Sequence, residues 1–410
     1  MRIVHTADWH LGDRLGRIDR TDDLRRQVEQ IAQICNARQA DVLLIAGDLF
    51  SELARPDGLR EAIAHLQVVF DEFLGQGGTI LAITGNHDNE NFCETLCHAM
   101  SLAAPAQQFA SQQATRGRLY LATQPTWLLL PDATKNFDVG FVLMPFPSPV
   151  RYLPSGVKYA DFEEKNRLLS AAFSQVLGRL TDAVRLRCSG PLVMVGHITV
   201  SGAHELPLFR MAHNEDVVLP LSQIPSAFAY VALGHIHVPT AIADHIRYCG
   251  SIDRLDLGER NDQKGVVFLD VDQSGFRSMP EFIPLDATPI YDVVIAEPSR
   301  DLQSLPARFP QAQRDLVRLT IRYHSGRDSL EEILRQLDKV FPRWYTREWH
   351  DVGQTGPEID AAKPGHASFR DVVLDYLNQE LVQYDLTERS AILERAERLI
   401  AALEQGIVAS

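Results

Sequence analysis

Five apolar, strand-like segments of the sequence end on side chains that can bind a metal ion or move a proton. The segments are "IVHTAD", "LLIAGD", "LAITGN", "LVMVGH" and "VALGH". Their ends carry, in chain order, Asp8 with His10 two residues on, Asp48, Asn86 followed by His87 and Asp88, His197, and His235 with His237 two residues on. In open α/β sheets, ligands collect beyond the carboxyl ends of the strands. We therefore expect these five ends to converge on one site.

The donor set of these ends indicates a pair of divalent ions. Carboxylate, amide and imidazole donors without thiolates suit manganese, iron or zinc better than calcium. Asp48, on a central strand, is the best candidate to bridge two ions. Two ions about 3.5–4 Å apart clamp a phosphate ester and ionise a water for in-line attack. His87 is then left as a non-ligand that protonates the leaving oxygen, and Asp88 is expected to orient its ring.

Each short motif also has a purely structural interpretation. An isolated "GD" or "GH" carries almost no information, and "DWH" alone is compatible with a polar turn. Asn86 or Asp88 is also a good N-cap for a following helix. The ordered set behind five apolar strands is far harder to explain in this way. Glycines precede four of the ends and allow close approach of backbone and ligand: Gly47, Gly85, Gly196 and Gly234.

The elements that must position these side chains alternate in the first half of the chain. Strands near 2–8, 41–48 and 79–86 alternate with helices expected at 21–39 and 57–78. This βαβαβ start indicates an α/β core. Further strands and a helix at 160–186 follow, and we expect a layered α/β/β/α domain over residues 1–284.

Beyond residue 284 the pattern of strand-like and helix-like segments changes. Residues 285–353 predict a small α+β domain of ββαβ-like order, for which the family resemblance described below implies a capping role, and 354–366 reads as a linker. Residues 367–410 predict a C-terminal helix pair with large apolar stripes. A partner groove or an intramolecular pairing would cover these stripes, and we favour the partner. The stripes contain Leu374, Leu377, Leu381, Ile392, Leu399 and Leu403.

The bulk composition is that of a globular protein, with 45% hydrophobic and 23% charged residues. The net charge of −14 counts against coating of nucleic acid by bulk attraction, although bound cations can invert the local field. No apolar run is long enough to predict a membrane span. The strand-like start and five scattered cysteines favour a cytoplasmic protein with reduced thiols. Cys93 and Cys97 are read as core residues rather than a zinc half-site.

The ordered motifs D-x-H, GD, GNHD, GH and GHxH resemble those of the metallophosphoesterase superfamily, the calcineurin-like phosphoesterases. Within it the chain is similar to the SbcD family, the nuclease subunits of bacterial SbcCD double-strand-break repair complexes. The stretches "MRIVHTADWHLGDRL", "VLLIAGDLF", "VALGHIHVPT" and "RYCGSIDRLDLGE" carry this resemblance, which covers almost all of the chain.

The resemblance implies a role for each of the site residues. One metal would be held by Asp8, His10, Asp48 and His237. The other would be held by Asp48, Asn86, His197 and His235, with His87 as the catalytic histidine. It further implies manganese-dependent cleavage of DNA phosphodiesters, as a 3′-to-5′ exonuclease on duplex ends and an endonuclease on single strands or hairpins.

The resemblance also implies partners. A homodimer would form through helices near the active site, at 57–74 and 90–103, unless their apolar faces merely pack on the sheet. Those faces contain Leu66, Phe70, Phe73, Phe92 and Leu96. The 285–353 unit would help to place DNA over the metals, and the terminal helices would dock on the coiled-coil base of an SbcC-type ATPase. Arg14, Arg17 and Arg20 are expected to contact DNA, or else to form a solvated loop.

One position departs from the family pattern. Many relatives carry His or Asp after "GDLF", where this chain has Ser51 followed by Glu52. A neutral hydroxyl cannot do the acid–base or ligand work of an imidazole, so endonuclease chemistry is the safer expectation. Two other functions stay open, a small-molecule phosphodiesterase or phosphatase and a non-catalytic DNA-end tether. The extra 285–410 region favours the nuclease over the first, and the complete ligand set argues against the second.

Overall fold

The computed structural model describes residues 1–103, 114–132, 137–201 and 216–353, with a few isolated positions between 377 and 398. The contacts divide the chain into two units, Met1–Gly353 and Gln354–Ser410. The predicted linker lies outside the described residues, and so does nearly all of the predicted helix pair. The fold below is therefore that of the first unit.

The first sheet is built around parallel strands that bury both faces. Its order is β16-β15-β1-β4-β5-β6, with β17 also paired to β15. The parallel strands are β1 (Arg2–Thr6), β4 (Val42–Ala46), β5 (Thr79–Ile83) and β6 (Leu119–Ala122). Strand β15 joins β1 antiparallel, and the added strands are β15 (Gly265–Asp272), β16 (Gly275–Phe276) and β17 (Glu281–Pro284).

The second sheet has six strands in the order β13-β14-β12-β9-β8-β7. Its four central strands run parallel, and both edge strands run antiparallel to their neighbours. The strands are β7 (Thr126–Asp132), β8 (Phe137–Met144), β9 (Leu192–His197), β12 (Phe228–Gly234), β13 (Thr240–Ala243) and β14 (Ile246–Tyr248).

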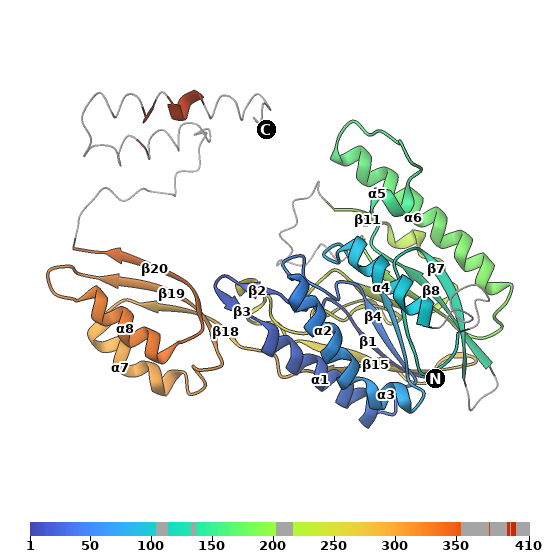
Figure 1. Ribbon diagram of the computed structural model, residues 1–410, viewed down its shortest axis with the longest axis horizontal. Coiled ribbons are helices and arrows are strands. Elements are labelled where there is room, and N and C mark those ends of the chain that lie inside the picture. Colours follow the sequence, from blue (N-terminus) through green and yellow to red (C-terminus); the bar gives the residue numbers. More distant parts are fainter. Residues whose placement is uncertain are drawn as a thin grey trace. The chain divides into compact units, whose positions relative to one another are not determined.

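The two sheets pack face to face, and helices cover their outer faces (Figure 1). Alternate residues of each strand divide between the layers, because successive side chains point to opposite faces. Leu44 of β4 packs with Phe141 and Val195 of the second sheet, whereas Leu43 and Ile45 pack under the helices. The helices on the first sheet are α1 (Thr21–Ala37), α2 (Pro56–Val69), α3 (Asp71–Gly75) and α4 (Glu90–Ala103), and those on the second are α5 (Pro149–Tyr152) and α6 (Phe162–Arg185). The predicted α/β/β/α layering is confirmed.

The helix expected at 57–78 is two helices. The chain leaves helical geometry at Phe70 (φ −99°, ψ 6°), which separates α2 from α3. The break turns the side chains of Phe70 and Phe73 into the core under the sheet. Cys93 is also buried in this core, and Cys97 packs against it. These two cysteines therefore have the core role that we favoured.

The small unit after residue 284 has its own hydrophobic core and a three-stranded parallel sheet. Its elements are β18 (Ile290–Ile295), α7 (Pro298–Arg308), β19 (Leu316–Tyr323), α8 (Leu330–Val340) and β20 (Trp344–Asp351). The expected ββαβ order was wrong, because a parallel strand pair needs a crossover and α7 supplies it. Two prolines make this segment look unlike a helix in sequence. Pro298 is in the first turn, where proline is tolerated, and Pro306 is inside the helix.

The remaining described elements are short. They are β2 (Arg14–Leu15), β3 (Ile18–Asp19), β10 (Thr199–Val200), β11 (Val218–Leu219), and the 3-10 turns η2 (Leu221–Gln223) and η3 (Leu257–Glu259). Strands β2 and β3 form a hairpin before α1, and β10 pairs with β11 beyond the end of β9. No described helix is long and apolar enough to cross a lipid bilayer.

A buried charge network joins α1 to the small unit. Asp23, in the first turn of α1, accepts hydrogen bonds from Arg20, Arg26 and Arg343. Arg20 has no exposed surface, and its other guanidinium nitrogen binds Asp253 at 3.0 Å. Asp23 and Arg20 thus form the buried part of the ionic contacts that hold the small unit, whereas Arg343 keeps 20% of its side chain exposed.

Candidate metal centre

The strand ends of the two sheets meet at one place. Strands β1, β4 and β5 are adjacent and parallel, so their carboxyl ends share one edge of the first sheet, and β9 and β12 do the same in the second. Nε2 of His197 lies 3.3 Å from Oδ2 of Asp48 and 3.0 Å from Oδ1 of Asn86. Nδ1 of His235 lies 3.0 Å from the same amide oxygen. Side chains that are far apart in sequence thus face one another across the two sheets.

Two groups of candidate ligand atoms result, and they overlap. One ligand atom from each of Asp8, His10 and His237 lies within 4.8 Å of the others, and the same holds for Asp8, Asp48 and His197. Oδ2 of Asp48 also lies 3.6 Å from Nε2 of His10. The two groups share Asp8, and Asp48 of the second group also reaches His10 of the first, so both carboxylates lie where a bridging ligand is needed.

Each of these imidazoles has one nitrogen that faces this space and can bind a cation once it carries no proton. Nδ1 of His197 lies 2.7 Å from the carbonyl oxygen of Ala46, which only accepts, so Nδ1 donates and Nε2 is free to bind a cation. Nδ1 of His237 similarly lies 2.8 Å from Oε1 of Glu259. Nε2 of His10 is buried and makes no hydrogen bond to any described residue. Imidazole nitrogens that can give up a proton to a cation, next to buried carboxylates, fit a pair of metal ions.

The backbone at the strand ends is held in an unusual conformation. Asp8, His10, Asp48 and His235 have φ between 46° and 90°, a region that non-glycine residues seldom adopt. Backbone hydrogen bonds from Trp9 and His10 to the carbonyl oxygen of Asp48 fix the first two turns against each other. Such strain persists only where surrounding structure imposes it, and it concentrates at functional sites.

Gly47 shows why a glycine precedes a strand end. Its φ is 94°, and a methyl group at this position would overlap the ring of His197. The second sheet can therefore approach the end of β4 only because this residue has no side chain.

Charge and burial shift the pKa values of the clustered groups in opposite directions. Burial lowers the pKa of His10 to about 3, so its imidazole is neutral. Burial also disfavours the charged form of His197, but the carboxylates of Asp48 and Asp8 outweigh it and raise that pKa to about 9. Despite burial, the charge of His197 holds the pKa of Asp48 far below its usual range. Bound divalent ions would replace the proton of His197 as partners of these carboxylates.

His87 lies at the mouth of the cluster rather than inside it. Its ring is 5.0 Å from that of His10 between centroids, and its backbone N–H donates to Oδ1 of Asp48 at 2.9 Å. About a third of its side chain is exposed, 36%. A group that gives a proton to a departing oxygen needs this combination of proximity and access.

Asp88 does not orient His87, which corrects the expectation from sequence. Its buried carboxylate accepts from the backbone N–H groups of Gly85, Phe50 and Leu49, and so ties the ends of β4 and β5 together. Burial, followed by the nearby charge of Asp48, raises the pKa of Asp88 to about 6.

The carboxylate that faces His87 is Glu52. Its Oε2 lies 3.6 Å from Nδ1 of His87, and the glutamate side chain is largely exposed. The neighbouring Ser51 is buried and donates to Oδ1 of Asp13 at 2.9 Å. Ser51 therefore anchors this loop to the turn after His10.

The three arginines expected to bind DNA have different surroundings. Arg20 is fully buried in the network with Asp23, and a side chain without exposed surface cannot meet a phosphate, so this expectation is corrected. Arg17 stacks on Trp344 at 3.9 Å and donates to two carbonyl oxygens of the small unit. Arg14 pairs with Asp19 in the β2–β3 hairpin and keeps 47% of its side chain exposed. Arg14 and Arg17 are both exposed, but Arg17 is engaged with the small unit, so Arg14 is the better candidate for a DNA contact.

Two carboxylates next to the cluster were not found by sequence reasoning. Glu259 contacts His237 and also pairs with the buried Lys264 at 2.7 Å. Asp216 lies 3.3 Å from Nε2 of His235. Glu259 is the acid of the "GE" in the stretch "RYCGSIDRLDLGE", so the sequence motif could have identified it as a site residue. The sequence around Asp216 contains no comparable motif.

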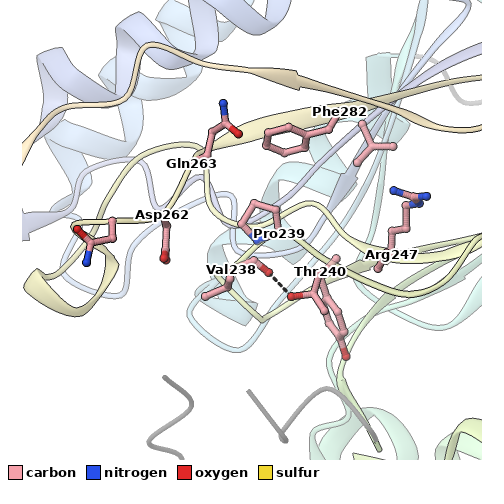
Figure 2. A pocket seen from close by; sticks show the side chains of 11 residues that line it. Val238, Pro239, Thr240, Arg247, Asp262, Gln263 and Phe282 are labelled. Carbon is pink, nitrogen blue, oxygen red and sulfur yellow. Dashed lines mark hydrogen bonds between the residues drawn. The ribbon is translucent and has the colours of Figure 1, made fainter. Parts of the chain in front are cut away.

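A separate pocket of about 500 Å³ opens beside the segment that follows His237. Figure 2 shows Pro239, Arg247, Gln263 and Phe282 around it, with Oγ1 of Thr240 donating to the carbonyl of Val238. None of the predicted metal ligands lines this pocket. The metal centre therefore depends on the strand ends and not on this cavity.

Comparison with known proteins connects these features to a family. Residues 1–239 match the sequence model of the calcineurin-like phosphoesterases. The chain is 28% identical over 273 residues to the SbcD component of the SbcCD nuclease of Escherichia coli strain K12, covering 65% of this chain and 64% of that protein. It is 28% identical to the SbcD component of the SbcCD nuclease of Bacillus subtilis strain 168, covering 66% of each. It is also 26% identical to "DNA double-strand break repair protein Mre11" of Aeropyrum pernix, covering 72% of this chain and 63% of that protein. The matches thus span just under two thirds of these relatives.

Proposed function

Because this chain belongs to the calcineurin-like phosphoesterase family, we propose that it is a two-metal DNA nuclease that acts in double-strand-break repair. One observation carries the proposal. Two overlapping groups of ligand atoms, from Asp8, Asp48 and three histidines, face one space in which Nε2 of His10 has no other described partner. The names of the relatives, a nuclease component and a break-repair protein, supply the substrate class.

The residues of each metal site can be named. Asp8, His10, Asp48 and His237 would hold one ion, and Asp48, Asn86, His197 and His235 the other. Manganese fits this mixture of carboxylate, amide and imidazole donors. When bound, two such ions hold phosphate-ester oxygens and make a water nucleophilic at neutral pH.

The remaining chemistry belongs to the protein's own side chains. His87, exposed at the mouth and close to His10, would hand a proton to the leaving oxygen of the scissile phosphodiester. Asp88 keeps the loop that carries His87 against the end of β4. The strained turns at Asp8 and Asp48 hold the ligands in place before an ion arrives, which lowers the ordering cost of binding.

We propose two activities for this site, 3′-to-5′ exonuclease cleavage of duplex ends and endonuclease cleavage of single-stranded or hairpin DNA. The endonuclease step needs only the proposed metal ligands and His87. The hydroxyl of Ser51 donates to Asp13 and cannot act as an imidazole or carboxylate would, so the exonuclease step lacks the extra group that the resemblance implies for many relatives. Endonuclease activity should therefore be the stronger of the two.

We further propose an SbcC-type ATPase as partner, through residues 367–410, and a homodimer near the active site. The dimer faces expected on 57–74 and 90–103 are largely used by the core, since Phe70 and Phe73 are buried, and Leu66, Phe92 and Leu96 pack against the core. Val68 and Leu102 remain exposed on α2 and α4 and are available to a second copy. The 285–353 unit would then cap the DNA.

The test compares three substrates with manganese present: end-labelled duplex DNA, a DNA hairpin and a small chromogenic phosphodiester. The parent should cut both DNA substrates, and His87→Ala should bind manganese as the parent does but lose at least 100-fold in cleavage rate. His98→Ala, at an exposed histidine of α4, is the matched control and should cut normally. The proposal fails if His87→Ala cuts DNA at the parental rate, or if only the small phosphodiester is hydrolysed.

A further inference from the structure

The two histidines of "GHIH" are each backed by a different carboxylate. Nδ1 of His237 faces Glu259 at 2.8 Å, and Nε2 of His235 faces both carboxylate oxygens of Asp216 at 3.3 Å. The two rings use opposite nitrogens for this contact, so they present opposite nitrogens to the cluster. Each histidine ring is thus oriented by a different carboxylate.

Asp216 is held by contacts with two neighbouring elements and with the residue that follows it. Oγ1 of Thr199, in β10, donates to Oδ2 of Asp216, and the backbone N–H of Val217 donates to Oδ1 at 2.8 Å. Nδ2 of Asn166, on α6, donates to the carbonyl oxygen of Asp216 at 3.0 Å. The carboxylate is 9% exposed. A side chain fixed in this way can impose an orientation on the ring that it contacts.

The atoms on the other side of His235 explain why its orientation matters. A carboxylate accepts hydrogen bonds, so the proton of the neutral imidazole lies on Nε2 and Nδ1 carries a lone pair. That lone pair points at Oδ1 of Asn86, 3.0 Å away, and the same oxygen faces Nε2 of His197 at 3.0 Å. With His197 deprotonated, as metal binding requires, these three atoms are all acceptors and repel one another unless a cation lies between them.

We propose that Asp216 is the positioning residue of the second metal: it fixes the ring and tautomer of His235 so that Nδ1 is available as a ligand. This inference rests on the proposed function, in which Asp48, Asn86, His197 and His235 hold that ion. Glu259 supports His237 in the first metal site in the same manner but through separate contacts. The affinities of the two ions are therefore set by two independent carboxylates, one supplied by the segment before β11 and one by η3.

The experiment measures manganese binding by calorimetric titration of the metal-free full chain. The parent should bind two ions. Asp216→Ala should weaken one of them by 10–100-fold, the usual effect of losing such a partner, and leave the other unchanged. Glu259→Ala should do the reverse, weakening the ion that Asp216→Ala spares. Asp216→Asn, which keeps the size and one acceptor oxygen, should lose less than Asp216→Ala and provides a second variant if the alanine form folds poorly.

A second readout does not depend on metal or activity. Histidine-selective ¹⁵N labelling of the metal-free parent should show the proton of His235 on Nε2, and Asp216→Ala should show a mixture of tautomers. The proposal is overturned if the proton lies on Nδ1 in the parent, or if Asp216→Ala binds both ions like the parent. A parent that loads two ions yet cuts no DNA would refute the nuclease function and leave the role of Asp216 standing.

Discussion

Replacing Asp23 tests whether the buried charge network holds the small unit onto the rest of the molecule. Asp23 is 2% exposed and accepts from three arginines, two of which belong to the first domain and one, Arg343, to the small unit. Asp23→Ala leaves these guanidinium groups without their shared carboxylate. Removing one partner of a buried ion pair costs about 3–5 kcal/mol. We expect the lower end, about 3 kcal/mol, because Arg20 keeps Asp253 at 3.0 Å.

This cost converts to a shift in melting temperature. The entropy of unfolding is roughly 2.1 cal/mol/K per residue near 60 °C, or about 0.7 kcal/mol/K for Met1–Gly353 unfolding as one unit. A loss of about 3 kcal/mol then lowers the melting temperature by about 4 °C. Asp22→Ala is the matched control, since Asp22 is exposed in the same helical turn, and it should cost about 1 °C or less.

The pH dependence of the Asp23 effect has a definite sign. Burial opposes ionisation of Asp23, but its bonds to Arg343 and Arg20 prevail and hold the pKa of this carboxyl below its usual value of 3.8. A lowered carboxyl pKa contributes stability above pH 3.8 and loses it as the pH falls through the folded value. The gap between parent and Asp23→Ala should therefore be full at pH 7 and shrink below about pH 4. Calorimetric scans at both pH values measure it, and equal melting temperatures for Asp23→Ala and Asp22→Ala at pH 7 would refute the reasoning.

Two further predictions concern the site and the DNA. Gly47→Ala should abolish binding of at least one manganese ion, because the added methyl group meets the ring of His197 and φ is 94°. Gly58→Ala, in α2 with nothing near the new methyl group, should raise stability by about 0.5–1 kcal/mol and leave metal binding intact. Arg14→Ala should weaken DNA binding only a few-fold and reduce the magnitude of the salt slope by about 1, as expected for one lost phosphate contact. Unchanged manganese titration of Gly47→Ala, or an unchanged salt slope for Arg14→Ala, would contradict these two predictions.

The layered core and the convergence of the strand ends could be predicted because both follow from local patterns. Apolar runs such as "VLLIA" show buried parallel strands, and the topology of such sheets places their carboxyl ends together. Asp8, Asp48 and His197 needed no knowledge of loop conformation, since each directly ends or follows a strand.

The supporting residues could not be predicted because loops bring them in. Asp216 reaches His235 across 19 residues of sequence, and Glu52 reaches His87 from a different strand end. Arg20 looked like a solvent-facing basic residue, but its partner Asp253 is 233 residues away and buries it. Asp88 likewise takes backbone partners that only the packed turns create.

The origin of the ligands in two different sheets has a consequence for the whole domain. Asp8, Asp48 and Asn86 follow strands of one sheet, whereas His197 and His235 follow strands of the other. An ion bound at the proposed site would therefore hold the two sheets together, and its binding energy would oppose any movement that separates them. A substitution that loosens the packing between the two sheets, even far from the proposed ligands, should therefore first lower the affinity for the metal ion.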